Sequence, residues 1–205
     1  MLATAGDCVT RILCSAVLAV FLSSVLPARA EAQTKSTRID SQRGAELSLF
    51  GGAAADADDL GGSFGWSMAW RPSDRVAIEG SGSWTPTLAP DGFAALFGPR
   101  IYLNTTGRTA PFVTIEAGLF HASVDRTKPG VSDFYLDRMP PGSPETAFND
   151  FVAAGGGGLD VRVKGRLWAR PHARFLVVVD GWRTYVVAVA GLHLSYRFTA
   201  LGTGP

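Results

Sequence analysis

Most of this sequence alternates apolar and polar residues at period two. In the segment 62–71, Phe64, Trp66, Met68 and Trp70 are large and apolar, and the residues between them are small or polar. Successive side chains of a β-strand point to opposite faces, so this period predicts strands and not helices. Eight such segments are expected, at 44–53, 62–71, 75–85, 93–103, 111–123, 150–163, 167–179 and 183–198.

Each predicted strand has one face of large apolar residues and a second face that is small, polar or charged. In 75–85, for example, Val76, Ile78 and Trp84 lie opposite Glu79. Strands of about ten residues can cross a bilayer when tilted, with apolar residues toward lipid and polar residues toward a lumen. The pattern therefore predicts an all-β, eight-stranded antiparallel up-and-down transmembrane β-barrel. A soluble lipocalin-like barrel remains an alternative, but it requires the large apolar face to point inward.

The connections between the predicted strands alternate between short and long. Arg71–Arg75 and Lys164–Arg166 read as tight turns, whereas 54–61 and 124–149 are longer. Short turns on one side and longer loops on the other are typical of outer-membrane barrels. Asp180–Gly181 departs from this rule, because a tight hairpin stands where a long loop is expected. We expect any binding specificity to reside in 124–149.

The first 30 residues are typical of a cleaved signal peptide. The apolar run from Ile12 to Leu26 is too short to span a bilayer as a helix. It ends at an A-x-A pattern, which places cleavage after Ala30, with Ala32 as the alternative. Segment 31–43 is then a polar lead-in, 44–198 the barrel domain and 199–205 a short C-terminal tail.

Composition removes several classes of function. The two cysteines, Cys8 and Cys14, lie within the predicted signal, so no disulfide or thiol chemistry is expected after cleavage. Removing the signal leaves equal numbers of basic and acidic residues, and a neutral chain does not favour nucleic acid as a partner. We expect an outer-membrane location, a structural or surface-interaction role, no catalysis and no cofactor.

The last predicted strand resembles the β-signal of outer-membrane proteins, through Gly191, Leu194, Tyr196 and Phe198. Segment 70–80 is similar to a hairpin of the small outer-membrane β-barrel superfamily, the group of the OmpA transmembrane domain and the opacity-type proteins. The resemblance implies a porin-like eight-stranded barrel, with lipid and the barrel assembly machinery as partners. It implies no particular activity.

Charged residues recur on the faces predicted to point inward. Eight strands leave an interior just wide enough for side chains, and charges buried there must pair. The alternatives are a static plug of ion pairs or a gated, narrow pore. The predicted network contains Glu46, Glu79, Arg100, Glu116, Asp160, Arg162, Arg174 and Arg197, with His172 and His193 nearby.

A weaker catalytic hypothesis rests on His121 and Ser123, which are predicted to face lipid at one end of a strand. The pair resembles the His-x-Ser of lipid A deacylases. In such an enzyme the histidine would activate the serine, and Asp137 or Glu145 would orient the histidine.

Two other features are interpreted more simply. The carboxylates of Asp56, Asp58 and Asp59 could bind calcium, but their spacing matches no calcium loop, and a solvated acidic loop is the simpler interpretation. The glycines of 155–158 indicate a bend or a close backbone approach in the barrel wall.

Overall fold

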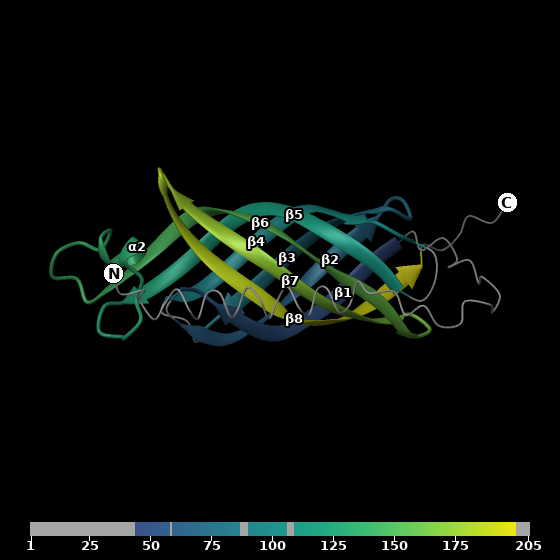
Figure 1. Cartoon of the computed structure of the whole chain (residues 1–205), viewed down its shortest axis with the longest axis horizontal. Coiled ribbons are helices and arrows are strands. Elements are labelled where there is room, and N and C mark those ends of the chain that lie inside the picture. Colours follow the sequence, from purple (N-terminus) through teal and green to yellow (C-terminus); the bar gives the residue numbers. More distant parts are fainter. Residues whose placement is uncertain (1–43, 58, 87–89, 106–108, 200–205) are drawn as a thin grey trace, which may run out of the picture.

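The computed structural model describes residues 44–57, 59–86, 90–105 and 109–199, and confirms the predicted fold (Figure 1). Eight antiparallel strands form a closed barrel in sequence order, and the last strand pairs with the first. The predicted signal peptide, the lead-in and residues 200–205 lie outside the described residues. The strands are β1 (Gly44–Ala55), β2 (Leu60–Arg71), β3 (Val76–Thr85), β4 (Asp91–Tyr102), β5 (Thr109–Asp125), β6 (Glu145–Lys164), β7 (Leu167–Asp180) and β8 (Arg183–Thr199).

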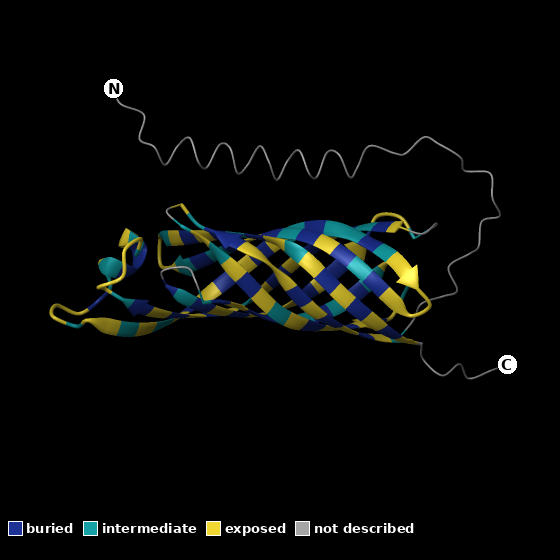
Figure 2. Ribbon diagram, turned by 90° about the horizontal axis from the view of Figure 1, so that it is seen from below, coloured by how far each residue is buried: buried dark blue, intermediate teal, exposed yellow. Residues whose placement is uncertain are grey.

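The period-two pattern becomes a checkerboard of exposed and buried residues on the barrel wall (Figure 2). On β4, Phe93, Phe97 and Ile101 are exposed, whereas Leu96 and Arg100 are buried. The large apolar side chains therefore form the outside of the barrel and the charged ones the inside. This orientation is the reverse of what the lipocalin-like alternative requires.

The two ends of the barrel differ. The turn end holds β2–β3, β4–β5 and β6–β7 connections, and the loop end holds the other four (Figure 1). Gly165 and Gly181 close the two tightest hairpins, β6–β7 and β7–β8, with φ of 56° and 60°. L-residues with a Cβ rarely adopt this left-handed region, so glycine suits both turns. The β5–β6 connection carries the short helix α2 (Asp133–Leu136), capped by Ser132.

Strands β5 and β6 are longer than predicted at the loop end. They remain paired up to Asp125 and Glu145, so the connection is 126–144 and the predicted 124–149 was too wide. Thr146, Phe148 and Asp150 share the more buried face of this extension, but their mixed polarity gives no apolar–polar alternation from which the sequence could have predicted it.

The glycines at 155–158 do not interrupt β6, which pairs continuously with β5 on one side. A Cβ on Gly156 would lie 2.4 Å from the carbonyl oxygen of Ala173, and one on Gly158 would lie 2.3 Å from that of Pro171. A close backbone approach is therefore present. Among the described residues, no helix has the length and apolar character needed to cross a membrane.

Candidate functional site

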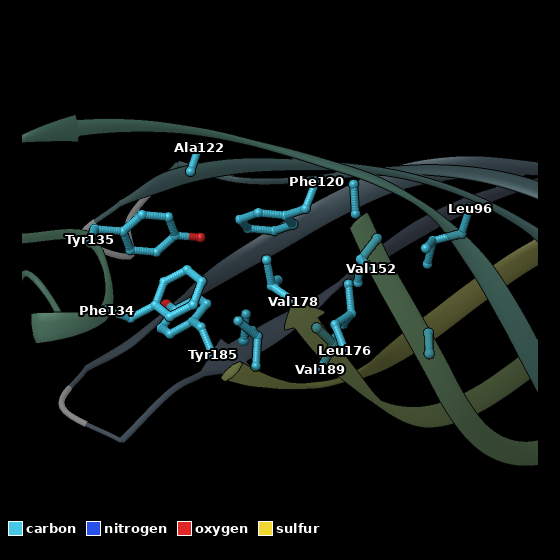
Figure 3. Close-up of a cluster of buried hydrophobic side chains, with 14 of the residues drawn as sticks. Leu96, Phe120, Ala122, Phe134, Tyr135, Val152, Leu176, Val178, Tyr185 and Val189 are labelled. Carbon is cyan, nitrogen blue, oxygen red and sulfur yellow. The ribbon is translucent and has the colours of Figure 1, made fainter. Parts of the chain in front are cut away.

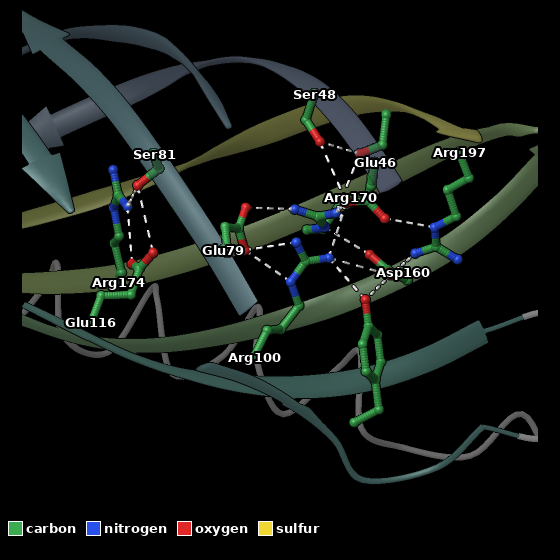
Figure 4. A network of polar contacts seen from close by, with 12 residues as sticks. Glu46, Ser48, Glu79, Ser81, Arg100, Glu116, Asp160, Arg170, Arg174 and Arg197 are labelled. Carbon is green, nitrogen blue, oxygen red and sulfur yellow. Dashed lines mark hydrogen bonds and ion pairs between the residues drawn. The ribbon is translucent and has the colours of Figure 1, made fainter. Parts of the chain in front are cut away.

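An ion cluster fills the lumen in the half of the barrel nearer the turn end (Figure 4). Its members come from six strands and are all buried. Three carboxylates face three guanidinium groups, so the cluster is electrically balanced. The residues are Glu46, Glu79, Asp160, Arg100, Arg170 and Arg197.

Glu46 on β1 is the hub of the ion cluster. Its Oε1 accepts a hydrogen bond from Arg100 Nη1 at 3.1 Å and another from Arg170 Nη2, and its Oε2 accepts from Arg197 Nε at 2.6 Å. Ser48 Oγ also donates to Oε1, at 3.4 Å. One carboxylate thus joins β1 to its neighbour β8, to β7 and, across the lumen, to β4.

The other two carboxylates complete the ion cluster. Glu79 accepts from Arg100 Nε at 2.9 Å and from Arg170 Nη1 at 3.2 Å. Asp160 accepts from Arg170 Nε at 2.7 Å and from the Tyr102 hydroxyl at 2.9 Å. Buried charges in this arrangement are paired and hydrogen-bonded, which is the condition for tolerating them away from water.

Aromatic side chains cover the ion cluster toward the turn end. The guanidinium carbon of Arg197 lies 3.8 Å from the ring centre of Trp168, and that of Arg71 lies 4.1 Å from the ring centre of Tyr102. Arg71 also donates to the carbonyl of Asp74 in the adjoining turn. The aromatic rings and Arg71 therefore narrow the lumen at this end.

A smaller polar group lies further along the lumen. Arg174 Nη1 is 3.2 Å from Glu116 Oε2, and Arg174 also donates to Ser81 and Ser83. Beside it, the ring centres of His172 and His193 are 5.1 Å apart.

The predicted network is largely placed inside the barrel, with one error. Arg162 is exposed and donates to the carbonyl of Gly165 in the β6–β7 turn. Arg162 keeps the register of the strand and pairs with Trp168, but β6 reaches the end of the barrel there, so its side chain lies in the turn region and not in the lumen. Arg170 takes part instead. It was missed, although it lies two and four residues before the inward-facing His172 and Arg174.

The half of the lumen nearer the loop end is apolar, contrary to the expectation that ion pairs fill the whole lumen. The signal was present in the sequence. The runs 175–179 and 185–189 are apolar without alternation, which is typical of strands with two apolar faces. The buried residues of this half include Phe50, Leu96, Phe120, Val152, Leu176, Val178, Val187 and Val189.

Helix α2 folds back into the mouth of the barrel at the loop end (Figure 3). Phe134 and Tyr135 are buried there against Tyr185 of β8, with ring centres 5.9 Å and 5.2 Å away. The Tyr185 hydroxyl donates to Asp56 Oδ2 at 2.5 Å. The segment around α2 therefore plugs the mouth with aromatic side chains.

Arg138 connects the segment around α2 to the barrel wall through ion pairs. Its guanidinium forms two hydrogen bonds with Asp150 of β6, at 3.0 Å and 2.6 Å, and its Nε lies 3.0 Å from Asp180 of β7. The hydrogen bonds to Asp150 raise the pKa of Arg138. Burial, together with the nearby Asp150 carboxylate, raises the pKa of Tyr135 well above its usual value.

His121 and Ser123 lie on the outer face of β5, as the catalytic hypothesis expects. His121 Nδ1 is 2.8 Å from Asn149 Oδ1, however, and Asp137 pairs with Arg183. Within the part of the chain that the structure describes, no hydrogen bond joins His121 to Ser123, Asp137 or Glu145. The structure brings the pair to one face without assembling a triad.

The remaining predicted positions are distributed over the wall. Leu194, Tyr196 and Phe198 of the predicted β-signal point outward on β8, and Gly191 lies against β1, where a Cβ would be 2.5 Å from the carbonyl oxygen of Gly51. Their role in assembly stays a prediction.

In the acidic loop, Asp56 Oδ1 accepts from the amide of Asp59, and Asp58 lies outside the described residues. In the described part of the chain, no three His, Cys, Asp or Glu side chains are placed to hold a metal ion.

A closed eight-stranded antiparallel barrel, apolar outside and filled by side chains inside, is the architecture of the small outer-membrane barrels. The structure is similar to the N-terminal β-barrel domain of OprF from Pseudomonas aeruginosa, with a TM-score of 0.51 and 16% identity over 76% of this chain and 99% of that one. It is also similar to Neisserial surface protein A, with a TM-score of 0.51 and 14% identity over 75% and 96%. These similarities confirm the predicted resemblance in fold. No protein-family model and no curated protein matches the sequence.

Proposed function

We propose that this protein is a non-conducting outer-membrane barrel with a structural or surface-interaction role at its loop end. The observation that carries the proposal is the filled lumen. Charged side chains occupy one half and apolar side chains the other, and α2 plugs the mouth. A hydrated ion would have to displace paired charges and then cross an apolar segment, and both steps are unfavourable.

The exterior supports a membrane location. Leu49, Phe97, Ile115 and Leu119 are each more than 60% exposed, and their exposure to water would be costly. Because outer-membrane barrels keep their short turns in the periplasm, we place the loop end outside the cell. The partners are then membrane lipid and, through β8, the barrel assembly machinery.

Two measurements test this proposal. Fractionation of cells, followed by gel migration with and without boiling, should place the protein in the outer membrane with a heat-dependent mobility shift. In planar bilayers the folded protein should then give no steady conductance. Recovery in the soluble periplasm without a shift would contradict the membrane location, and stepwise conductance would contradict the filled lumen.

The proposed role does not include hydrolysis, because His121 is hydrogen-bonded to Asn149 and no hydrogen bond joins it to Ser123 among the described residues. Ser123→Ala should therefore leave the acyl pattern of lipid A in cells unchanged relative to the wild-type protein. A difference in acyl pattern between these two strains, at equal barrel levels in the membrane, would restore the hydrolase hypothesis.

A further inference from the structure

The mouth at the loop end combines two carboxylates with aromatic rings around one cation. The barrel wall supplies Asp150 and Phe148 from β6 and Asp180 from β7, whereas the cation, Arg138, comes from the β5–β6 connection. The guanidinium carbon lies 4.5 Å from the ring centre of Phe148 and 4.9 Å from that of Phe134. The wall therefore contributes two carboxylates and an aromatic ring at the mouth, and the β5–β6 connection supplies the cation between them.

Asp150 depends on this cation. Its side chain is 4% exposed, and among the described residues only Arg138 pairs with it. A carboxylate buried to this extent is strongly unfavourable without a counter-ion. The Asp150 carboxylate therefore needs a cation beside it in the folded barrel, whether that cation belongs to this chain or to another molecule.

A second observation is that one polar group in the mouth forms no hydrogen bond with Arg138 or with any other described residue. Tyr135 is fully buried, and its hydroxyl has no hydrogen-bond partner within the described residues. In Figure 3 this hydroxyl points into the barrel, on the side of Phe120. A buried hydroxyl normally has a partner, so this one is free to bind a polar group of an incoming molecule.

We propose that the mouth at the loop end is a binding site for a guanidinium group, that Arg138 is its built-in occupant, and that an arginine-like external molecule can exchange with it. The proposal rests on the loop end facing the exterior, as in the proposed function. Two parallel hydrogen bonds to one carboxylate together with stacking on aromatic rings favour a planar guanidinium over an ammonium group.

Exchange is sterically accessible because Arg138 lies at the rim, with its side chain 18% exposed. It follows a helix of one turn that the Ser132 cap holds at its start. A tethered group competes at an effective concentration on the order of mM, so an external ligand must reach that range to replace Arg138 in the wild-type protein.

Chemical rescue tests this proposal. Arg138→Ala should lower the temperature at which the folded barrel changes its gel mobility, measured in lipid nanodiscs. Ethylguanidinium should then recover more than half of the lost transition temperature, and its effect should saturate with concentration. Ethylurea has a similar shape without the charge, and at the same concentration it should recover none. Asp150→Asn in the same background should abolish the rescue. Lys128→Ala is the matched control. Lys128 lies in the same connection, but its Nζ is 3.6 Å from Asp91 Oδ2, so ethylguanidinium should not raise the transition temperature of this variant.

Exchange in the wild-type protein has its own readout. Displacing Arg138 should release the plug and increase cleavage by chymotrypsin after Phe134 and Tyr135, with ethylguanidinium but not with ethylurea. If Arg138→Ala does not fold, Arg138→Lys replaces it in the rescue experiment, because it keeps the charge and loses the paired hydrogen bonds.

Equal effects of ethylguanidinium and ethylurea in both experiments would overturn the proposal. Conductance in planar bilayers would overturn the proposed function instead, and that assay does not depend on either probe.

Discussion

Glu46 is the position at which the ion cluster can be tested most directly. Glu46→Gln keeps the size of the side chain and removes its charge. The cluster of the variant then holds three guanidinium groups and two carboxylates. The new amide NH₂ also has no acceptor: it faces either Arg197 Nε or the guanidinium groups of Arg100 and Arg170, which donate to Glu46 Oε1 in the wild-type protein. Removing one partner of a buried ion pair costs about 3–5 kcal/mol, which corresponds to roughly two to four orders of magnitude in the unfolding equilibrium constant.

Urea unfolding in lipid vesicles, followed by tryptophan fluorescence, measures this cost. Asp91→Asn is the matched control, because Asp91 and its partner Lys128 are 36% and 49% exposed and an exposed pair contributes at most about 1 kcal/mol. A second test is Glu46→Gln combined with Arg197→Gln, which restores the charge balance and should recover part of the lost stability. If Glu46→Gln costs less than about 1 kcal/mol at an unchanged urea dependence, the cluster does not stabilise the barrel through charge pairing.

Two further predictions use neighbouring or opposite positions as their own controls. Gly156→Ala should destabilise the barrel by about 1–3 kcal/mol, because its Cβ would meet the β7 backbone, whereas Gly155→Ala, with open space around its Cβ, should be close to neutral in the same urea experiment. Leu176→Ala should cost about 2–5 kcal/mol, because it leaves a cavity in the apolar half of the lumen. Leu194→Ala, on the lipid-facing side, should cost less than half as much, because lipid can fill the space. Equal costs within either pair would contradict the assignment of the two faces.

Much of the barrel wall was predictable because the information is local. A period of two residues assigns Phe97 and Ile101 to the outside and Arg100 to the inside without any knowledge of the neighbouring strands. The same reasoning identified Glu46, Glu79 and Asp160 as inward-facing charges, and would have identified Arg170. It failed at Arg162, which keeps its register with β7 but lies where β6 reaches the end of the barrel.

The sequence by itself determined the strands, their two faces and most of the connections, because these depend on residues a few positions apart. Only the tertiary structure decided which charges meet. Glu46 and Arg170 are 124 positions apart and come together through the register of every strand around the closed barrel. The pairing of Arg138 with Asp150 likewise depends on α2 folding back into the mouth, a contact that no period in the sequence encodes. Alternation specifies the face of a strand, whereas contacts across a lumen require the closure and stagger of all eight strands together.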